Sequence, residues 1–133
     1  MSPIILAFYA LGLAGVGLGL AALWLNWRSI PPGVGEGGWR SARAASFALG
    51  LVLGGVSVPL TLHLRYPIET ADGHGQVAGI PFFVSYTDRL GHDFLSVLSL
   101  ADVVANGAFW FLLPQLALWV WAARRRALAS PRP

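Results

Sequence analysis

The sequence contains neither cysteine nor lysine in its 133 residues. Without cysteine the chain cannot form disulfides, thiolate metal sites, iron–sulfur clusters or Cys-x-x-Cys redox centres. All nine basic residues are therefore arginine. Proteins encoded by GC-rich bacterial genomes typically use little lysine and much Ala, Gly, Leu and Arg. We therefore expect a bacterial protein.

Charge is also scarce. Charged residues make up only 11% of the chain, against about 25% in a typical soluble domain. Apolar residues make up 56%, and the mean hydropathy is +0.63. A soluble domain needs charge over its whole surface, whereas a lipid-facing surface needs none. The composition therefore predicts an integral membrane protein.

Three long apolar runs are each able to cross a bilayer, because roughly 20 helical residues span the ~30 Å hydrocarbon core. We expect a single all-α membrane domain with three transmembrane helices, at residues 3–26, 44–64 and 95–123. The alternative for the first run is a cleaved signal peptide, with a basic segment ahead of an apolar stretch of about 7–15 residues. No basic residue precedes Pro3 and the run is longer, so we favour a transmembrane helix.

Two polar loops separate these spans, and residues 124–133 follow them as an irregular tail. Residues 27–43 contain Pro31, Pro32 and several glycines, which favour a loop. Residues 65–94 carry a turn signal at Asp72-Gly73 between stretches rich in β-branched and aromatic residues, which predicts a short β-hairpin or an extended loop on the membrane surface. Five apolar side chains of this external loop have to be buried against the helix ends or in the headgroup layer: Ile80, Phe82, Phe83, Val84 and Tyr86.

The arginines predict the orientation, because cytoplasmic loops are enriched in basic residues. Three spans place the 27–43 loop and the tail on the same side, and both are rich in arginine, whereas the 65–94 loop has two arginines and four acidic residues. We therefore predict an N-out, C-in protein of the bacterial cytoplasmic (inner) membrane, and we interpret the positive charge as a topology signal and not as a nucleic-acid surface. The predicted topology anchors are Arg28, Arg40, Arg43, Arg124, Arg125 and Arg126.

Two pairs of glycines have the spacing of helix-packing motifs. Gly15 and Gly19 are four residues apart in the first run, and Gly50 and Gly54 in the second. Small residues at this spacing allow helix backbones to approach closely in lipid. We favour packing between the first two helices of this chain; the alternative is a face for dimerisation or for a larger subunit.

Four polar residues are candidates for a ligand or proton-transfer site. Asp102 and Asn106 lie on one face of the third helix, and His63 is expected at a similar depth on the second. An ionisable residue inside a membrane helix is costly and suggests a function. The structural alternatives are a solvent-accessible helix cap at Asp102 and an interfacial histidine at position 63. Gln115 follows Pro114, and it either faces a pocket or bonds the carbonyl that this proline leaves free.

The sequence contains no motif for metal, haem or catalysis. The histidines lack HxxxH or HExxH spacing, and there is no phosphate loop, Ser/His/Asp array or pair of catalytic carboxylates. We predict neither a metal nor another cofactor, and we favour a protein that is not an enzyme.

Three helices bury little surface among themselves, which favours a partner in addition to the lipid bilayer. Our leading hypothesis is a structural or accessory subunit that packs with other membrane helices, as a homo-oligomer or within a larger complex. The alternative is a small ligand-binding or proton-handling membrane protein that uses His63, Asp102 and Asn106.

Overall fold

The computed structural model describes residues 3–70, 73–95 and 99–129. Its main elements are three helices, α1 (Pro3–Arg28), α2 (Glu36–His63) and α3 (Ser99–Ala129). Each helix is long and apolar enough to cross a membrane, and many of their large apolar side chains are exposed on the outside of the bundle. An exposed apolar surface of this kind is suited to lipid and not to water.

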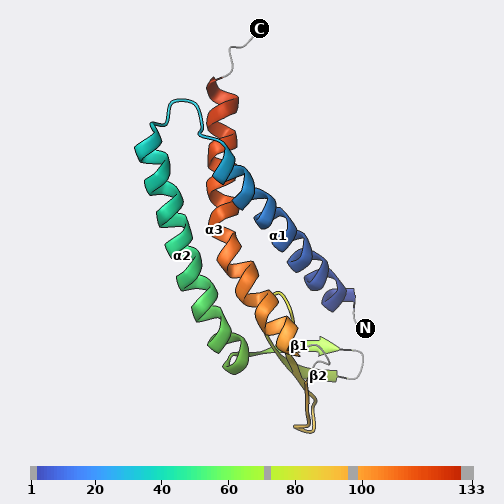
Figure 1. Ribbon diagram of the computed structural model, residues 1–133. Coiled ribbons are helices and arrows are strands. Elements are labelled where there is room, and N and C mark those ends of the chain that lie inside the picture. The colour runs from blue at the N-terminus through green and yellow to red at the C-terminus, as the bar shows by residue number, and fades with distance from the viewer. Residues whose placement is uncertain (1–2, 71–72, 96–98, 130–133) are drawn as a thin grey trace.

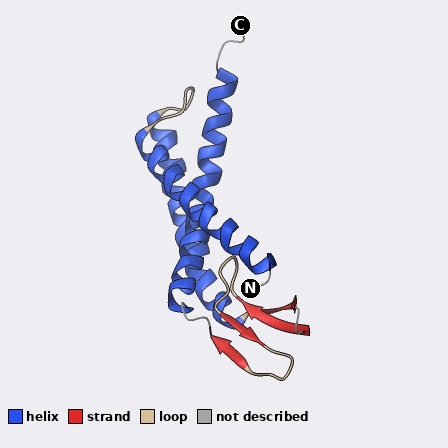
Figure 2. Ribbon diagram, turned by 90° about the vertical axis from the view of Figure 1, so that its right-hand side faces the viewer, coloured by secondary structure: helices blue, strands red, loops and turns tan. Residues whose placement is uncertain are grey.

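Helix α3 is the centre of the bundle. It packs along both α1 and α2, which make little contact with each other, and Figure 1 shows it passing between the two. The N-terminal end of α1 and the segment between α2 and α3 lie at one end of the molecule, and the C-terminal end of α3 lies at the other (Figures 1 and 2).

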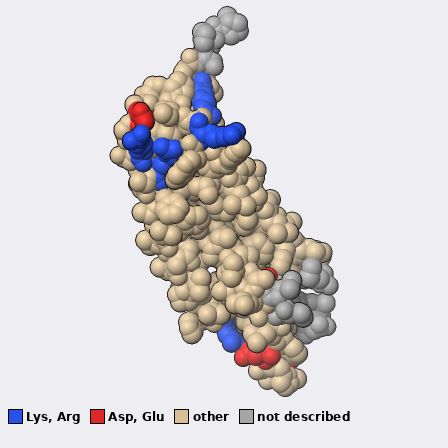
Figure 3. Space-filling view, viewed as in Figure 1, with Lys and Arg blue, Asp and Glu red and all other residues tan. Residues whose placement is uncertain are grey.

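Charge divides the molecule along its length. Blue arginine surface gathers at the end where α3 finishes, and the apolar middle of the visible face shows almost no charge (Figure 3). We call this the arginine end, and the opposite one the sheet end. The arginine end carries six arginines of the described helices, and they are the predicted topology anchors: Arg28, Arg40, Arg43, Arg124, Arg125 and Arg126.

The segment between α2 and α3 holds a four-stranded antiparallel sheet, which is more strand than the single hairpin predicted within a mostly helical protein. The strands are β1 (Arg65–Thr70), β2 (Gly73–Ala78), β3 (Ser85–Thr87) and β4 (Asp93–Leu95), in the order β1-β2-β3-β4. The expected hairpin corresponds to β1 and β2, while its Asp72 lies outside the described residues. The last two strands have only three residues each, too few to show an alternating pattern.

Side chains on the sheet join strands that are distant in the sequence. The Arg65 guanidinium donates to Asp93 at 2.8 Å and also to Thr87. The hydrogen bond from Arg65 lowers the pKa of Asp93, and Asp93 in turn raises the pKa of Arg65. In the turn between β3 and β4, the backbone N–H of His92 donates to Asp88 at 2.8 Å and lowers the pKa of that carboxyl. Both carboxylates therefore favour their ionised form, and the Arg65–Asp93 pair links the edge strands β1 and β4.

Residues 36–43 are helical, so the loop predicted at residues 27–43 is wrong in extent. Only residues 29–35 separate α1 from α2. Trp39 is fully buried in the bundle, and Glu36 forms an ion pair with Arg40 at 2.6 Å. The ion pair joins residues one helical turn apart, and an acid in the first turn also suits the helix dipole. The burial of Trp39 and these charge interactions together outweigh the low helix propensity of the glycines at the start of α2.

The third helix also differs from its predicted limits. Phe94 and Leu95 belong to β4, so α3 begins at Ser99 and not at residue 95. At its other end α3 continues through the arginines to Ala129, so that part of the predicted irregular tail is helical. Residues 130–133 of the tail lie outside the described residues.

Both glycine pairs contact α3, so the expected packing of the first two helices through these pairs is wrong. A Cβ added at Gly19 would lie 2.6 Å from Leu112, and one added at Gly54 would lie 2.9 Å from the carbonyl oxygen of Gly107. The other member of each pair meets an aromatic residue of α3, Phe109 for Gly15 and Phe111 for Gly50. The four glycines let α3 approach both neighbours closely, as packing in lipid requires.

Gly54→Leu should destabilise the bundle, whereas Gly55→Leu in the same turn should not. A side chain at position 54 meets the α3 backbone, and nothing lies within 4 Å of a Cβ at position 55. Overpacking typically costs about 1–3 kcal/mol, and both variants gain the same helix propensity. Unfolding in detergent, followed by circular dichroism, measures the difference. Equal midpoints for the two variants would show that the contact of Gly54 with α3 is unimportant.

Candidate functional site

The most irregular backbone of the sheet end lies between β2 and β3, in residues 79–84, which we call the plug segment. Four of its side chains are buried: Pro81, Phe82, Phe83 and Val84. The backbone N–H of Val84 donates to Ala78 O at 2.8 Å and closes the segment into a loop. Gly79 has φ +99°, a conformation that favours glycine, and the Ile80–Pro81 peptide bond is cis. The expected burial is confirmed for Phe82, Phe83 and Val84, whereas it is wrong for Ile80, which is 41% exposed, and Tyr86 is only partly buried.

Asn106 of α3 holds the centre of the plug segment. Its Nδ2 donates to Phe82 O at 2.7 Å, and its Oδ1 accepts from Phe82 N at 2.9 Å. Asn106 is 0% exposed, so its amide and the Phe82 backbone group pair entirely with each other. A buried peptide group without partners is costly, and one asparagine satisfies both its donor and its acceptor.

Other side chains attach the plug segment to α3 and α1. Trp110 Nε1 donates to Ile80 O at 2.9 Å, and the Tyr9 hydroxyl donates to Phe83 O at 3.1 Å. The rings of Tyr9 and Phe82 meet edge to face at 5.4 Å. A Cβ on Gly12 would lie 2.7 Å from Phe82, so α1 has to present a glycine here. The plug segment therefore closes the sheet end between two helices.

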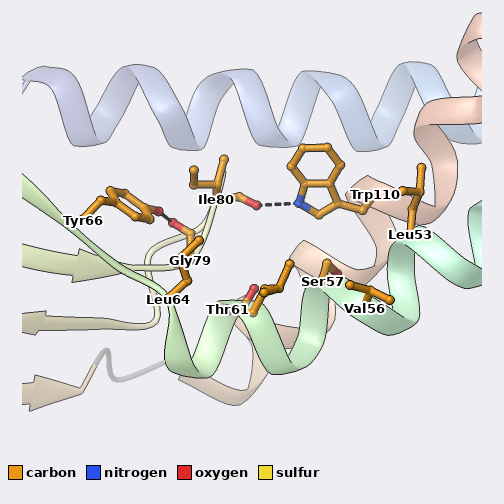
Figure 4. Close-up of a pocket in the computed structure, with 10 residues that line it drawn as sticks. Leu53, Val56, Ser57, Thr61, Leu64, Tyr66, Gly79, Ile80 and Trp110 are labelled. Carbon is orange, nitrogen blue, oxygen red and sulfur yellow. Dashed lines mark hydrogen bonds between the residues drawn. The ribbon is translucent and has the colours of Figure 1, made fainter.

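A cavity of about 220 Å³ lies beside the plug segment, between α2 and Trp110 of α3. Figure 4 shows side chains of α2 on one side of it and Tyr66, Gly79 and Ile80 on the other. The cavity is partly open, and its lining is mostly apolar. The lining residues are Leu53, Val56, Ser57, Leu60, Thr61, Leu64, Tyr66, Gly79, Ile80 and Trp110.

The polar atoms around this cavity are largely engaged in the fold. The Tyr66 hydroxyl donates to Gly79 O, and the Trp110 indole donates to Ile80 O (Figure 4). The Ser57 hydroxyl donates to Gly54 O at 2.7 Å. Burial raises the pKa of Tyr66 to about 12, so this hydroxyl remains a neutral donor at any physiological pH. The lining contains no carboxylate, histidine or arginine, and the site therefore offers shape and apolar contact but no acid–base chemistry.

The ligand and proton candidates do not form one site. His63 is exposed at the end of α2, whereas Asp102 is only 5% exposed, so the solvent-accessible cap expected at Asp102 is wrong. Within the described residues Asp102 Oδ2 has no hydrogen-bond partner, and no ion pair joins it to His63. Asn106 is engaged with Phe82, as described above.

Gln115 lies near the arginine end, in a buried polar cluster that the sequence did not reveal. Its backbone carbonyl accepts from Asn26 Nδ2 at 2.9 Å, and Asn26 O accepts from Trp39 Nε1 at 3.2 Å. Trp39 in turn stacks on Trp121, with ring centroids 6.4 Å apart. The Gln115 side-chain nitrogen is buried without a partner among the described residues, so the expected bond to the carbonyl freed by the preceding proline is not formed. The one sequence signal for this cluster was the polar Asn26 at the end of an apolar run.

Comparison of the chain with protein-family models, with curated proteins and with solved structures gives no significant match.

Asn106→Leu should release the plug segment. The substitution removes both bonds to Phe82, and each buried backbone group left without a partner costs about 1–3 kcal/mol. Hydrogen exchange in detergent should show faster exchange at the Phe82 amide, together with a lower unfolding midpoint. Val104→Leu, at an exposed position of the same helix, is the control and should exchange like the original protein. Unchanged protection at Phe82 in Asn106→Leu would contradict a role for Asn106 in holding the segment.

Proposed function

We propose that this protein is a structural or accessory subunit of a membrane complex, and that a helix of a partner packs into the cavity between α2 and Trp110. The observation that carries the proposal is a stripe of small residues on α2 that begins in contact with α3 and continues into the lining of the cavity. Gly50, Gly54, Ser57 and Thr61 are spaced at four, three and four residues along one face and are all buried.

The two halves of the stripe have different surroundings. Gly50 and Gly54 contact the backbone of α3 at Phe111 and Gly107. Ser57 and Thr61 form the floor of the cavity instead. Small residues at this spacing are typical of helix interfaces in lipid, where close packing and not the hydrophobic effect drives association. A bulky apolar side chain of a neighbouring helix would complete the contact.

The size and chemistry of the cavity favour a side chain over a soluble ligand. Its volume of about 220 Å³ lies below the roughly 300–1,000 Å³ of typical small-molecule sites. Such sites also present a few free polar groups that orient the ligand. Here the indole of Trp110 and the hydroxyls of Ser57 and Tyr66 are already bonded to backbone carbonyls. The lining can therefore recognise shape but offers little polar specificity.

The proposed location is the bacterial cytoplasmic membrane, with the arginine end in the cytoplasm. The six arginines at that end support this orientation, because basic residues are retained on the cytoplasmic side. The sheet and the N-terminal end of α1 then lie outside. In this arrangement the partner helix meets the protein in the outer half of the bilayer.

Site-directed photo-crosslinking in native membranes tests the proposed partner. The chain has no cysteine, so one introduced at Leu60, which lines the cavity, carries the only attached crosslinker. Leu6→Cys on α1 is the matched control, since Leu6 and Leu60 are 52% and 49% exposed and each lies three residues from a helix end at the sheet end. We expect a discrete protein adduct from position 60 and none from position 6.

The products distinguish the possible occupants of the cavity. An adduct with another membrane protein identifies the larger complex, and one of twice the chain mass identifies a second copy. Crosslinks to lipid alone, or equal yields at the two positions, would contradict helix docking.

Single cysteines also test the orientation. His74 is exposed on β2, and a Cβ at Gly37 near the start of α2 meets nothing within 4 Å, so both positions tolerate cysteine. In intact cells an impermeant maleimide should label His74→Cys, and it should label Gly37→Cys only after the membrane is opened. The reverse pattern would overturn the N-out, C-in orientation.

A further inference from the structure

A second groove lies at the arginine end, between the last turn of α1 and the first half of α2. It has a volume of about 430 Å³, and we call it the arginine groove. Seven residues line it: Trp27, Arg40, Arg43, Ala44, Phe47, Ala48 and Leu51. All but Trp27 lie on one face of α2, because they recur at intervals of three and four residues. The groove is cationic at its mouth and purely apolar along the rest of its length.

We propose that the arginine groove binds one anionic phospholipid from the leaflet at this end, with its phosphate at Arg40 and Arg43 and an acyl chain along Phe47 and Leu51. Basic recesses between transmembrane helices are suited to anionic headgroups. The proposal does not depend on the docking of a partner helix at the opposite end, and it holds for either orientation of the protein.

The contacts of Arg43 position its guanidinium before any lipid binds. It donates to Trp27 O at 3.2 Å and lies over the Trp27 ring, 5.3 Å from the ring centroid. A guanidinium has five N–H donors in a rigid fork that matches phosphate, so several remain for a headgroup. Little side-chain entropy is then lost on binding, which favours affinity.

Arg40 adds a second positive charge one turn away, and its own partner is an exposed acid. It bonds Glu36 at 2.6 Å, but the two side chains are 70% and 65% exposed, so this pair is weak and exchangeable. Glu36 is the acidic residue of α2 near the groove, and it leaves the mouth with net positive charge. A zwitterionic headgroup cannot neutralise that excess, whereas an anionic one can.

The length of the groove matches one leaflet. Arg40 and Leu51 are eleven residues apart on α2, a rise of about 16 Å at 1.5 Å per residue. Half of the ~30 Å hydrocarbon core is about 15 Å. The arginines therefore lie at headgroup level when Leu51 lies near the bilayer centre. The exposed rings of Trp27 and Phe47 flank the chain, and tryptophan is itself typical of the headgroup level.

Native mass spectrometry of the protein in mild detergent tests this site. Phosphatidylglycerol and phosphatidylcholine with identical acyl chains are titrated separately, and we expect one tightly retained copy of the anionic lipid only. Arg40→Gln with Arg43→Gln should weaken that binding by about tenfold or more, since each arginine contributes about 1 kcal/mol near a charged leaflet. Arg43→Lys keeps the positive charge but loses the forked N–H donors of the guanidinium, and it should weaken binding less than the double variant does.

The control removes the same charge from the same end outside the groove. Arg28 lies over the Trp24 ring at 4.1 Å, and Arg126 bonds Ser29 at 2.6 Å; neither lines the groove. Arg28→Gln with Arg126→Gln should leave the affinity within about twofold, and circular dichroism should show both double variants folded. If both double variants lost the same affinity, the lipid would be attracted by the overall positive charge of this end, and a specific site would be contradicted. Equal retention of the zwitterionic and anionic lipids would also contradict the site. Displacement by glycerol phosphate would mean a site for soluble phosphate and also contradict the proposal.

Discussion

The paired hydrogen bonds between Asn106 and the Phe82 backbone are the constraint on which the sheet end depends. Backbone groups that are buried away from water must find their hydrogen-bond partners within the protein. The plug segment carries such backbone between the ends of α1 and α3. Because Asn106 bonds the Phe82 N–H and C=O, the Phe82 ring can pack against Tyr9 and Gly12. The strands on either side of the plug segment are thereby attached to the helices. Trp110 and Tyr66 then cap the neighbouring carbonyls.

The second organising feature is the use of glycine within the chain. The two glycine pairs of α1 and α2 lie against α3, where any Cβ would collide. These faces are therefore occupied in the folded protein, and contact with other proteins has to use other surfaces. The small-residue stripe of α2 continues from its contact with α3 into the lining of the cavity, at Ser57 and Thr61. Because small residues of one helix face line it, we distinguish this cavity from an ordinary packing gap.

The sequence allowed the large-scale arrangement to be predicted, because hydrophobic length and arginine placement are both local properties. Three spans, a hairpin after the second and the burial of Phe82, Phe83 and Val84 could all be deduced from residue patterns. The sheet was underestimated because β3 and β4 have three residues each, too few to show an alternating pattern, although each pairs with a neighbouring strand in the sequence. The start of α2 was missed because burial of Trp39, a tertiary contact, stabilises residues that contain several glycines.

The candidate site was harder to predict than the fold. The sequence indicates Asn106 as a ligand or proton-transfer candidate, whereas in the structure its amide bonds the backbone N–H and C=O of Phe82, 24 positions earlier, which no helical spacing could indicate. His63 and Asp102 were grouped by depth alone, and depth does not fix the direction of a side chain. The arginine groove depends on how the end of α1 lies beside α2, which is equally invisible in the order of residues.

The order of the helices along the chain has a consequence for biogenesis. The helix that touches both others is the last to leave the ribosome, and its two neighbours make little contact with each other. Until α3 is present, the glycine surfaces of α1 and α2 therefore lack the helix that covers them in the folded protein. The bundle can therefore assemble only once α3 has been made, and the contacts that join α1 to α2 directly lie near the arginine end, such as the hydrogen bonds from Trp39 to Asn26 O and from Arg43 to Trp27 O.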